Sequence, residues 1–339
     1  MANINFSQRA LKLLESISNG RAKDVIARRF GLAGKNRETL ESIGQDPVYQ
    51  ITRERVRQIE SVGLGTLSQA KVLASFKPEF EFLKKYLVEN GGIRREEKIF
   101  EELGKDGNAG AVLLFLTLGN QFHYCGQEEK FDPFWATDKK LVKKVNGIID
   151  FVTKHFHANK DVVDGDLLVK LARKKDKAIS YATLASYVDA SKFLNKNNFD
   201  QFGLSHWAQI KPRGVRDKAY MILKKQKNPL HFSEVANLIN NEFISGRRAH
   251  IQTVHNELIK DNRFVLVGRG IYALDEWGYQ PGTVIDVMKQ ILKENSLLTK
   301  DQVLKEVLKK RLIKENTILI NLQNRKIFKR SSDDKYFLA

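Results

Sequence analysis

Ten consecutive residues carry side chains that are well suited to chemistry with DNA bases. They are Ile51-Thr52-Arg53-Glu54-Arg55-Val56-Arg57-Gln58-Ile59-Glu60. Arginine can bridge the O6 and N7 atoms of guanine, glutamine can pair with adenine, and glutamate can accept a hydrogen bond from the amino group of cytosine. The segment therefore holds three base-reading chemistries, and the side chains concerned are Arg53, Glu54, Arg57 and Gln58.

One short helix would present these four side chains together. Thr52 is a good N-cap residue, and residues three or four positions apart lie on the same helix surface. The four side chains then fall on adjoining faces near the N-terminal end, while Val56 and Ile59 face inward. This layout fits a major groove. The plainer alternative is a solvated charged face, which is common on helices, but the spacing and the flanking residues favour DNA reading.

A second short helix is predicted just upstream. Arg29-Phe30-Gly31-Leu32 reads as the end of a buried helix followed by a glycine stop. Thr39 then opens a short helix within Glu38-Thr39-Leu40-Glu41-Ser42-Ile43-Gly44. Together with the helix from Thr52 to Leu67, these segments predict a helix-turn-helix.

The run from about residue 21 to residue 67 closely resembles region four of housekeeping bacterial sigma factors, because several motifs occur in the family's order. In that family this module reads the promoter −35 element and rests on the flap of RNA polymerase. The resemblance implies double-stranded promoter DNA and the RNA polymerase core as partners, with Thr39 on the helix that touches the DNA backbone. The DNA-binding residues implied are Thr39, Thr52, Arg53, Glu54, Arg57 and Gln58.

Two stretches differ from the pattern of that family. The turn between residues 45 and 50 is longer than usual and contains Pro47, which would re-aim the recognition helix. After Glu60, two glycines, Gly63 and Gly65, stand inside the helix, and each weakens it by roughly 1 kcal/mol relative to alanine. We therefore expect the far end of the helix to fray and to lack some phosphate contacts.

The composition agrees with a nucleic-acid partner. The 339 residues include 58 Lys and Arg against 40 Asp and Glu, a formal charge of +18 that attracts phosphate. No apolar run approaches the roughly 20 residues of a membrane span, and the N-terminal residues lack a signal-peptide pattern. The single cysteine excludes an internal disulfide. We expect a cytoplasmic, nucleoid-associated protein; the resemblance adds that it is bacterial.

Helical stretches lead into short aromatic hairpins at three places beyond residue 67. The expected strand pairs begin near residues 120, 263 and 326. Helices followed by a two-stranded hairpin are typical of a winged helix, and three in one basic chain favour tandem winged helices. The alternative is that any small α+β domain ends in a hairpin.

The clearest of these segments runs from Arg213 to about Tyr279. It contains Pro-Leu-His from residue 229, Thr-Val-His-Asn-Glu-Leu from residue 253 and Gly-Arg-Gly-Ile-Tyr-Ala-Leu from residue 268. It resembles the HARE-type helix-turn-helix domain, a winged fold shared with the N-terminal domain of the RNA polymerase delta subunit. Arg247, Arg248 and His250 precede the expected third helix and Arg269 stands at the tip of the wing, so these four are candidate phosphate contacts. Arg269 could equally be an idle turn residue.

The expected fold class is mainly α: an N-terminal helix-turn-helix followed by tandem winged-helix domains. The expected domains are residues 1–75, the sigma-like head; 76–140, a possible winged helix; 141–212, a helical or winged-helix-like linker domain; 213–281, the HARE-type winged helix; and 282–339, a basic C-terminal winged helix. In the last domain the basic residues are Lys309, Lys310, Arg311, Arg325, Lys326, Lys329 and Arg330.

Catalysis and cofactor binding find little support in the sequence. His155 and His157 are two positions apart, which does not converge on a metal when they lie on a helix. Glu96-Glu97-Lys98 bears a faint likeness to a nuclease motif but lacks a paired carboxylate, and the segment Gly31–Lys35 lacks the spacing of a phosphate loop. We expect no enzyme activity, no metal, no cofactor and no small-molecule substrate.

Two functional hypotheses remain open. In the first, the chain is a sigma-like transcription regulator that reads a −35-like element through the helix from Thr52 to Leu67 and contacts RNA polymerase. No segment resembles the sigma module that melts the −10 element, so we do not expect it to open a promoter alone. In the second, the chain is a delta-like polymerase accessory or a chromosome-architectural protein that binds DNA without sequence preference.

Overall fold

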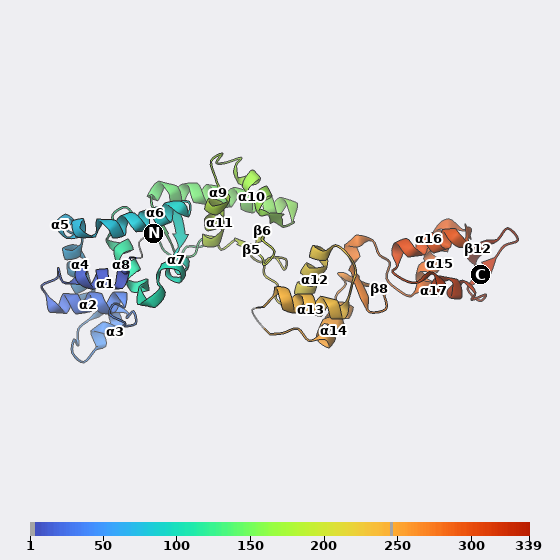
Figure 1. Cartoon of the computed structure of the whole chain (residues 1–339), viewed down its shortest axis with the longest axis horizontal. Helices are drawn as coiled ribbons and strands as arrows, with labels where there is room; N and C mark the ends of the chain where they lie inside the picture. The colour runs from blue at the N-terminus through green and yellow to red at the C-terminus, as the bar shows by residue number, and fades with distance from the viewer. Residues whose placement is uncertain (1–3, 245–246) are drawn as a thin grey trace. The chain divides into compact units, whose positions relative to one another are not determined.

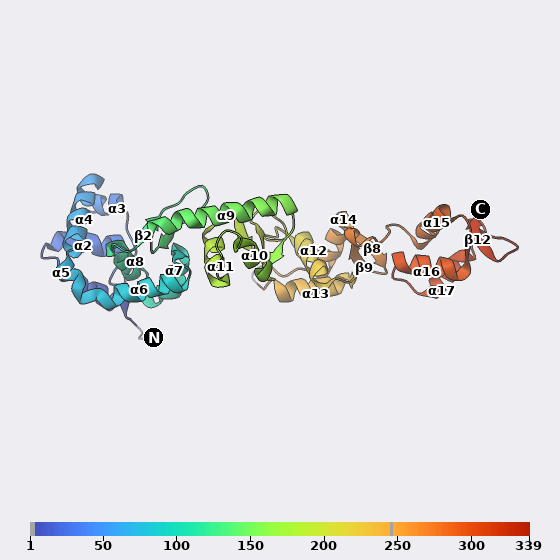
Figure 2. The same cartoon turned by 90° about the horizontal axis from the view of Figure 1, so that it is seen from above.

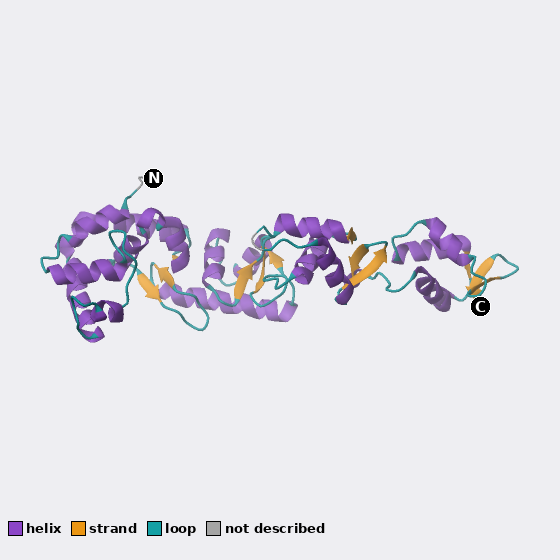
Figure 3. Cartoon of the chain, turned by 90° about the horizontal axis from the view of Figure 1, so that it is seen from below, coloured by secondary structure: helices purple, strands orange, loops and turns teal. Residues whose placement is uncertain are grey.

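The computed structural model describes residues 4–244 and 247–339, which form two compact units. The first extends to Lys196 and includes Asp200–Ser205, and the second comprises Asn197–Phe199 and His206–Ala339. Helices predominate in both, and the sheets are small and antiparallel (Figure 1, Figure 3). The expectation of a mainly α protein is confirmed.

The head, which we define as residues 6–67, is a cluster of short helices. They are α1 (Phe6–Leu14), α2 (Gly20–Phe30), α3 (Leu40–Gln45) and α4 (Arg53–Leu67). Each begins at a side chain that accepts a hydrogen bond from a backbone N–H of the first turn, and these N-caps are Asn5, Asn19, Thr39 and Thr52. Gly31, at φ 65°, ends α2 in the left-handed conformation that favours glycine.

Helix α4 is continuous to Leu67, so the expected fraying after Glu60 is wrong. Gly63 is buried against α2, where an added Cβ atom would lie 2.9 Å from Cγ1 of Ile26. Gly65 faces open space. The missing side chain at Gly63 thus lets two helices approach closely, and their packing offsets the low helix propensity of glycine.

The turn between α3 and α4 is held by backbone hydrogen bonds despite its length. The carbonyl of Asp46 accepts from the N–H groups of Tyr49 at 2.8 Å and Gln50 at 2.9 Å, and Ile51 donates to the carbonyl of Gly44 at 3.0 Å. A Cβ atom at Gly44 would lie 2.5 Å from the carbonyl oxygen of Ile51. Only glycine fits there, and the direction of the chain entering α4 is fixed.

Beyond the head, the described residues show the same order of elements four times: a helix, a short strand, two helices and two strands. The first repeat (77–136) comprises α6 (Lys77–Glu89), β1 (Ile93–Arg95), α7 (Glu96–Leu103), α8 (Ala109–Leu118), β2 (His123–Cys125) and β3 (Phe134–Ala136). The second repeat (139–204) comprises α9 (Lys139–Asn159), β4 (Val163–Asp164), α10 (Gly165–Ala172), α11 (Tyr181–Ala190), β5 (Leu194–Lys196) and β6 (Gln201–Leu204).

The other two copies lie in the second compact unit. The third repeat (215–274) comprises α12 (Val215–Gln226), β7 (Leu230–His231), α13 (Phe232–Glu242), α14 (Ile251–Lys260), β8 (Phe264–Gly268) and β9 (Ile271–Leu274). The fourth repeat (284–338) comprises α15 (Val284–Asn295), β10 (Leu298–Thr299), α16 (Lys300–Lys310), α17 (Glu315–Leu322), β11 (Phe328–Arg330) and β12 (Lys335–Leu338). Short helices α5 (Ala70–Leu73) and η1 (Ala74–Phe76) join the head to the first repeat.

All four repeats share one sheet topology. The strand orders are β1-β3-β2, β4-β6-β5, β7-β9-β8 and β10-β12-β11, so the first strand of each repeat pairs with the last strand of its hairpin. The second repeat contains this sheet as well, although its hairpin was not expected. Strand β1 covers Ile93–Arg95 directly before α7, and the His231 side chain caps α13.

The head and the first repeat share one hydrophobic core. Phe6 of α1 packs edge-to-face on Phe115 of α8, with ring centroids 5.8 Å apart. Gly110 of α8 lies so close to α2 that an added Cβ atom would stand 1.8 Å from the carbonyl oxygen of Phe30. The apolar run of residues 111–118 lies at the centre of this core.

Candidate nucleic-acid interface

The four predicted base-reading side chains are exposed at the start of α4. Their inward neighbours behave as expected, since Val56 is fully buried and Ile59 is partly buried against the head. The exposed residues are Arg53, Glu54, Arg57 and Gln58, and Arg55 is exposed among them. The first two turns of α4 thus present an uninterrupted polar surface to solvent.

Side-chain pairs within α4 orient these groups. The guanidinium of Arg57 donates to both carboxylate oxygens of Glu54, from Nε at 2.9 Å and from Nη2 at 2.7 Å. This bond holds the pKa of Glu54 below its usual value. Arg55 donates to the side-chain oxygen of Gln58 at 3.0 Å. Base reading by Arg57 or Gln58 would exchange these bonds for bonds to DNA. Arg55, which holds the side chain of Gln58, was not among the base-reading residues predicted from the sequence.

Two arginines at the end of α2 fix α3 and α4 relative to α2. Arg28 donates to both carboxylate oxygens of Glu38, at 2.8 and 2.6 Å, and its Nη2 lies 3.0 Å from Asp46. Arg29 donates to Glu60 of α4 at 3.0 Å and to the carbonyl of Glu38. These pairs join α2 to the segments on both sides of α3 and to α4, and the sequence did not indicate them.

Tyr49 closes the longer turn onto α2. Its hydroxyl donates to Asp24 at 2.8 Å, and the guanidinium of Arg21 lies 5.0 Å from the centre of its ring. Burial, followed by the hydrogen bond to Asp24, raises the pKa of Tyr49 to about 12. Tyr49, which belongs to the longer turn, thus anchors this turn to α2.

Thr39 and Thr52 have their expected capping positions. The Thr39 hydroxyl accepts from the N–H of Ser42 at 3.0 Å, and the Thr52 hydroxyl accepts from that of Arg55 at 3.2 Å. A hydroxyl that accepts one hydrogen bond can still donate its own proton. Both residues can therefore donate to a phosphate oxygen while they cap their helices.

The predicted cations of the third repeat are exposed. Arg247 and Arg248 precede α14, and Arg269 stands in the turn between β8 and β9 beside Gly270, which has φ 71°. Arg311, counted among the basic residues of the last domain, is instead buried, with 6% of its surface exposed, and donates to the carbonyls of Leu266 and Gln280. Its burial removes it from the possible nucleic-acid contacts.

The third helix is exposed to a different degree in the four repeats. In the first repeat α8 is buried over almost its whole length, and in the second repeat α11 packs on the first, where the Tyr187 hydroxyl donates to the carbonyl of Gly91 at 3.2 Å. In the third and fourth repeats, α14 and α17 keep one face exposed, on which polar residues lie beside the exposed Ile259 and Ile320. That face includes Gln252, Thr253 and Asn256 on α14, and Asn316 and Thr317 on α17.

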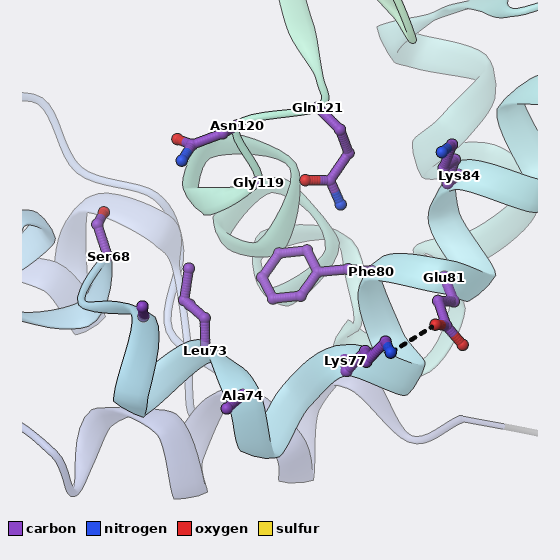
Figure 4. Close-up of a pocket in the computed structure, with 11 residues that line it drawn as sticks. Ser68, Leu73, Ala74, Lys77, Phe80, Glu81, Lys84, Gly119, Asn120 and Gln121 are labelled. Atoms are coloured by element: carbon purple, nitrogen blue, oxygen red, sulfur yellow. Dashed lines mark ion pairs between the residues drawn. The ribbon is translucent and has the colours of Figure 1, made fainter.

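A pocket of about 490 Å³ lies beside the link between the head and the first repeat (Figure 4). Leu73, Ala74 and Phe80 provide apolar lining, and Lys77 forms an ion pair with Glu81 at 3.7 Å on its rim. The pocket combines an apolar interior with a charged edge.

The two closely spaced histidines, His155 and His157, both lie on α9. His155 is within hydrogen-bonding distance of Asn159 on α9, the long helix visible in Figure 2. Within the described ranges, no three His, Cys, Asp or Glu side chains gather as a metal site. Nor does any described helix have the length and apolar character needed to cross a bilayer.

Part of the chain is similar to a known protein. A stretch of 56 residues is 46% identical to the RNA polymerase sigma factor SigA of Nostoc sp. (strain PCC 7120 / SAG 25.82 / UTEX 2576). The match covers 16% of this chain and 14% of that protein. No protein-family model matches the chain. Part of the chain is therefore similar to a sigma factor, and the resemblance of residues 213–280 to a HARE-type domain stays a prediction.

Proposed function

We propose that this protein is a sigma-like, DNA-binding transcription regulator that acts in the cytoplasm on the nucleoid. In this proposal α4 enters the major groove of a −35-like element and Arg53, Glu54, Arg57 and Gln58 read its bases. The observation that carries it is the rigid presentation of these four side chains on a helix that Arg29 ties to α2. The partial similarity to a sigma factor supports the same reading and extends it to RNA polymerase as a partner.

We further propose that the four repeats are winged helices. Their shared order of elements and their common strand order support this assignment, which includes a HARE-type domain at residues 213–280. The proposal assigns the chain no catalytic reaction, metal or cofactor. It assigns phosphate contacts to Arg247 and Arg248, which precede α14, and to Arg269 in the turn between β8 and β9; all three are exposed.

The test is selection of bound duplexes from a random library by the full chain, followed by binding of the enriched site and a scrambled site. With Arg57→Ala and Gln58→Ala, we expect each lost base contact to cost about 1–3 kcal/mol of discrimination, with nearly unchanged affinity for the scrambled site. Lys143→Gln, an exposed change on α9, serves as the control. Failure to enrich any sequence would contradict base reading by α4.

The second candidate is a polymerase accessory or architectural protein, favoured by the exposed cations of the third and fourth repeats. A genome-wide crosslinking map beside that of core polymerase separates the two. Sharp shared peaks near −35 would support the regulator, whereas broad signal over transcribed genes or bulk DNA would support the second candidate.

A further inference from the structure

The fourth repeat contains a hollow of about 910 Å³ that is lined by the β11–β12 hairpin and by the residues around the C-terminal end of α17. We call it the C-terminal groove. Its lining includes Leu322, Arg325, Phe328, Lys329, Tyr336 and Phe337. This volume is at the upper end of the roughly 300–1,000 Å³ of pockets that enclose small molecules, so the groove has room for a flat aromatic group and its substituents.

The hairpin register places an aromatic ring beside an amine on one face. Phe328 pairs across the hairpin with Leu338, and Lys329 pairs with Phe337. Because successive side chains of a strand point to opposite faces, these two pairs face opposite sides. Phe328 and Leu338 belong to the hydrophobic core of the repeat, so Lys329 and Phe337 lie on the side away from it.

The cations of the groove are available for an anionic ligand. Arg325 and Lys329 are exposed, and in the described part of the chain neither makes an ion pair. Arg330 differs, because it pairs with Asp334 on the same hairpin. Arg325 and Lys329 thus line the groove together with the partly exposed ring of Phe337, and the Asp334 carboxylate is already paired with Arg330.

Cations next to aromatic rings match the chemistry of unpaired nucleic acid. Proteins that bind single strands combine a basic groove for the phosphates with aromatic side chains on which bases stack. A duplex hides the faces of its bases, so it would use the cations and leave Phe337 without a role. An acidic peptide would likewise use only the charges.

We propose that the C-terminal groove binds unpaired nucleic acid, with Phe337 stacked on a base and Arg325 and Lys329 paired with the adjoining phosphates. This site is separate from α4 and goes beyond the reading of duplex DNA. It rests on the proposed function only in taking the chain to be a nucleic-acid-binding protein, and its test does not depend on sequence discrimination by α4.

The experiment is fluorescence anisotropy of the full chain with labelled oligothymidine of about ten nucleotides, a length within the roughly 4–16 nucleotides of single-strand sites. We expect Phe337→Leu to weaken binding about 5- to 150-fold, the range that the loss of one stacked base gives. Phe337→Trp should retain binding, because its ring can stack. Lys329→Gln should weaken binding without touching the ring, and it is informative even if Phe337→Leu unfolds the repeat.

Lys309→Gln provides the matched charge control, because Lys309 is exposed in the same repeat, pairs with Glu306 and lies outside the groove. The proposal is overturned if Lys329→Gln and Lys309→Gln have equal effects, or if Phe337→Leu folds and binds as the unchanged protein does. Equal competition by polyglutamate would also overturn it, as would an equal loss of duplex binding and of oligothymidine binding in Phe337→Leu. Oligothymidine binding and discrimination between duplexes are measured separately on the same protein, so failure of this site and failure of duplex reading by α4 are distinguishable.

Discussion

At the scale of single residues, Arg28 holds the segments on both sides of α3 without belonging to the exposed surface of α4. Its side chain is 13% exposed and reaches Glu38 before α3 and Asp46 after it. Replacement by alanine leaves two carboxylates without their cation. We expect Arg28→Ala to lower the free energy of unfolding of the head by about 2 kcal/mol, measured by urea denaturation. Arg55→Ala, which removes an exposed arginine of α4, should have a much smaller effect on stability.

The same contacts predict a pH dependence. The hydrogen bond from Arg28 lowers the pKa of Glu38 below its ordinary value of 4.5, and the Val48 backbone N–H, followed by Arg28, lowers the pKa of Asp46. Since both folded pKa values are depressed, this stabilisation is present above the ordinary values and is lost as pH falls through the folded ones. We expect the melting temperature to fall below about pH 4.5, and to fall less in Arg28→Ala. Parallel curves for the two proteins would refute this account.

The sequence predicted the exposed residues of α4 but not the residues that hold the helix in place. Helical periodicity alone places Arg57 and Gln58 outside and Val56 inside. The partners of Arg28 and Arg29, in contrast, lie up to 31 positions away, and no local pattern indicates them. The Glu54–Arg57 pair could have been found, because three-residue spacing on a helix brings opposite charges together.

At the scale of elements, Gly63 and Gly65 offer a matched pair. We expect Gly65→Ala to stabilise α4 by up to about 1 kcal/mol, because alanine has the higher helix propensity and the position faces open space. Gly63→Ala should lose that gain or destabilise the protein, because its Cβ atom meets Ile26. Urea denaturation of both variants checks this, and equal stabilisation by the two changes would show that α2 and α4 are not closely packed at Gly63.

Short strands explain most of what the sequence could not predict among the elements. Strands such as β4 and β10 contain two residues, too few for an alternating pattern to appear. The longer hairpin of the third repeat was predicted, since β8 and β9 flank a Gly-Arg-Gly turn. Likewise, the apolar run of α8 predicted burial but not that its partner would be the head.

At the scale of the whole molecule, the exposed cations predict a steep dependence of DNA binding on salt. Each phosphate contact that is lost reduces the slope of log affinity against log salt concentration by about 1. We expect this reduction for each of Arg247→Gln, Arg248→Gln and Arg269→Gln, with no change in sequence preference. Titrations at several salt concentrations measure the slope, and Lys143→Gln on α9 is the comparison. A slope that stays the same in all three variants would remove these arginines from the interface.

The buried α8 also determines how the head can be handled in isolation. A polypeptide cut after residue 75 would keep α1 and α2 but lose Phe115 and Leu114, against which they pack. Exposed apolar surface of that kind promotes self-association. Grafting α3 and α4 onto another protein should therefore succeed only when residues up to Ala136 are carried with them. Heating should melt the head and the first repeat in one cooperative transition.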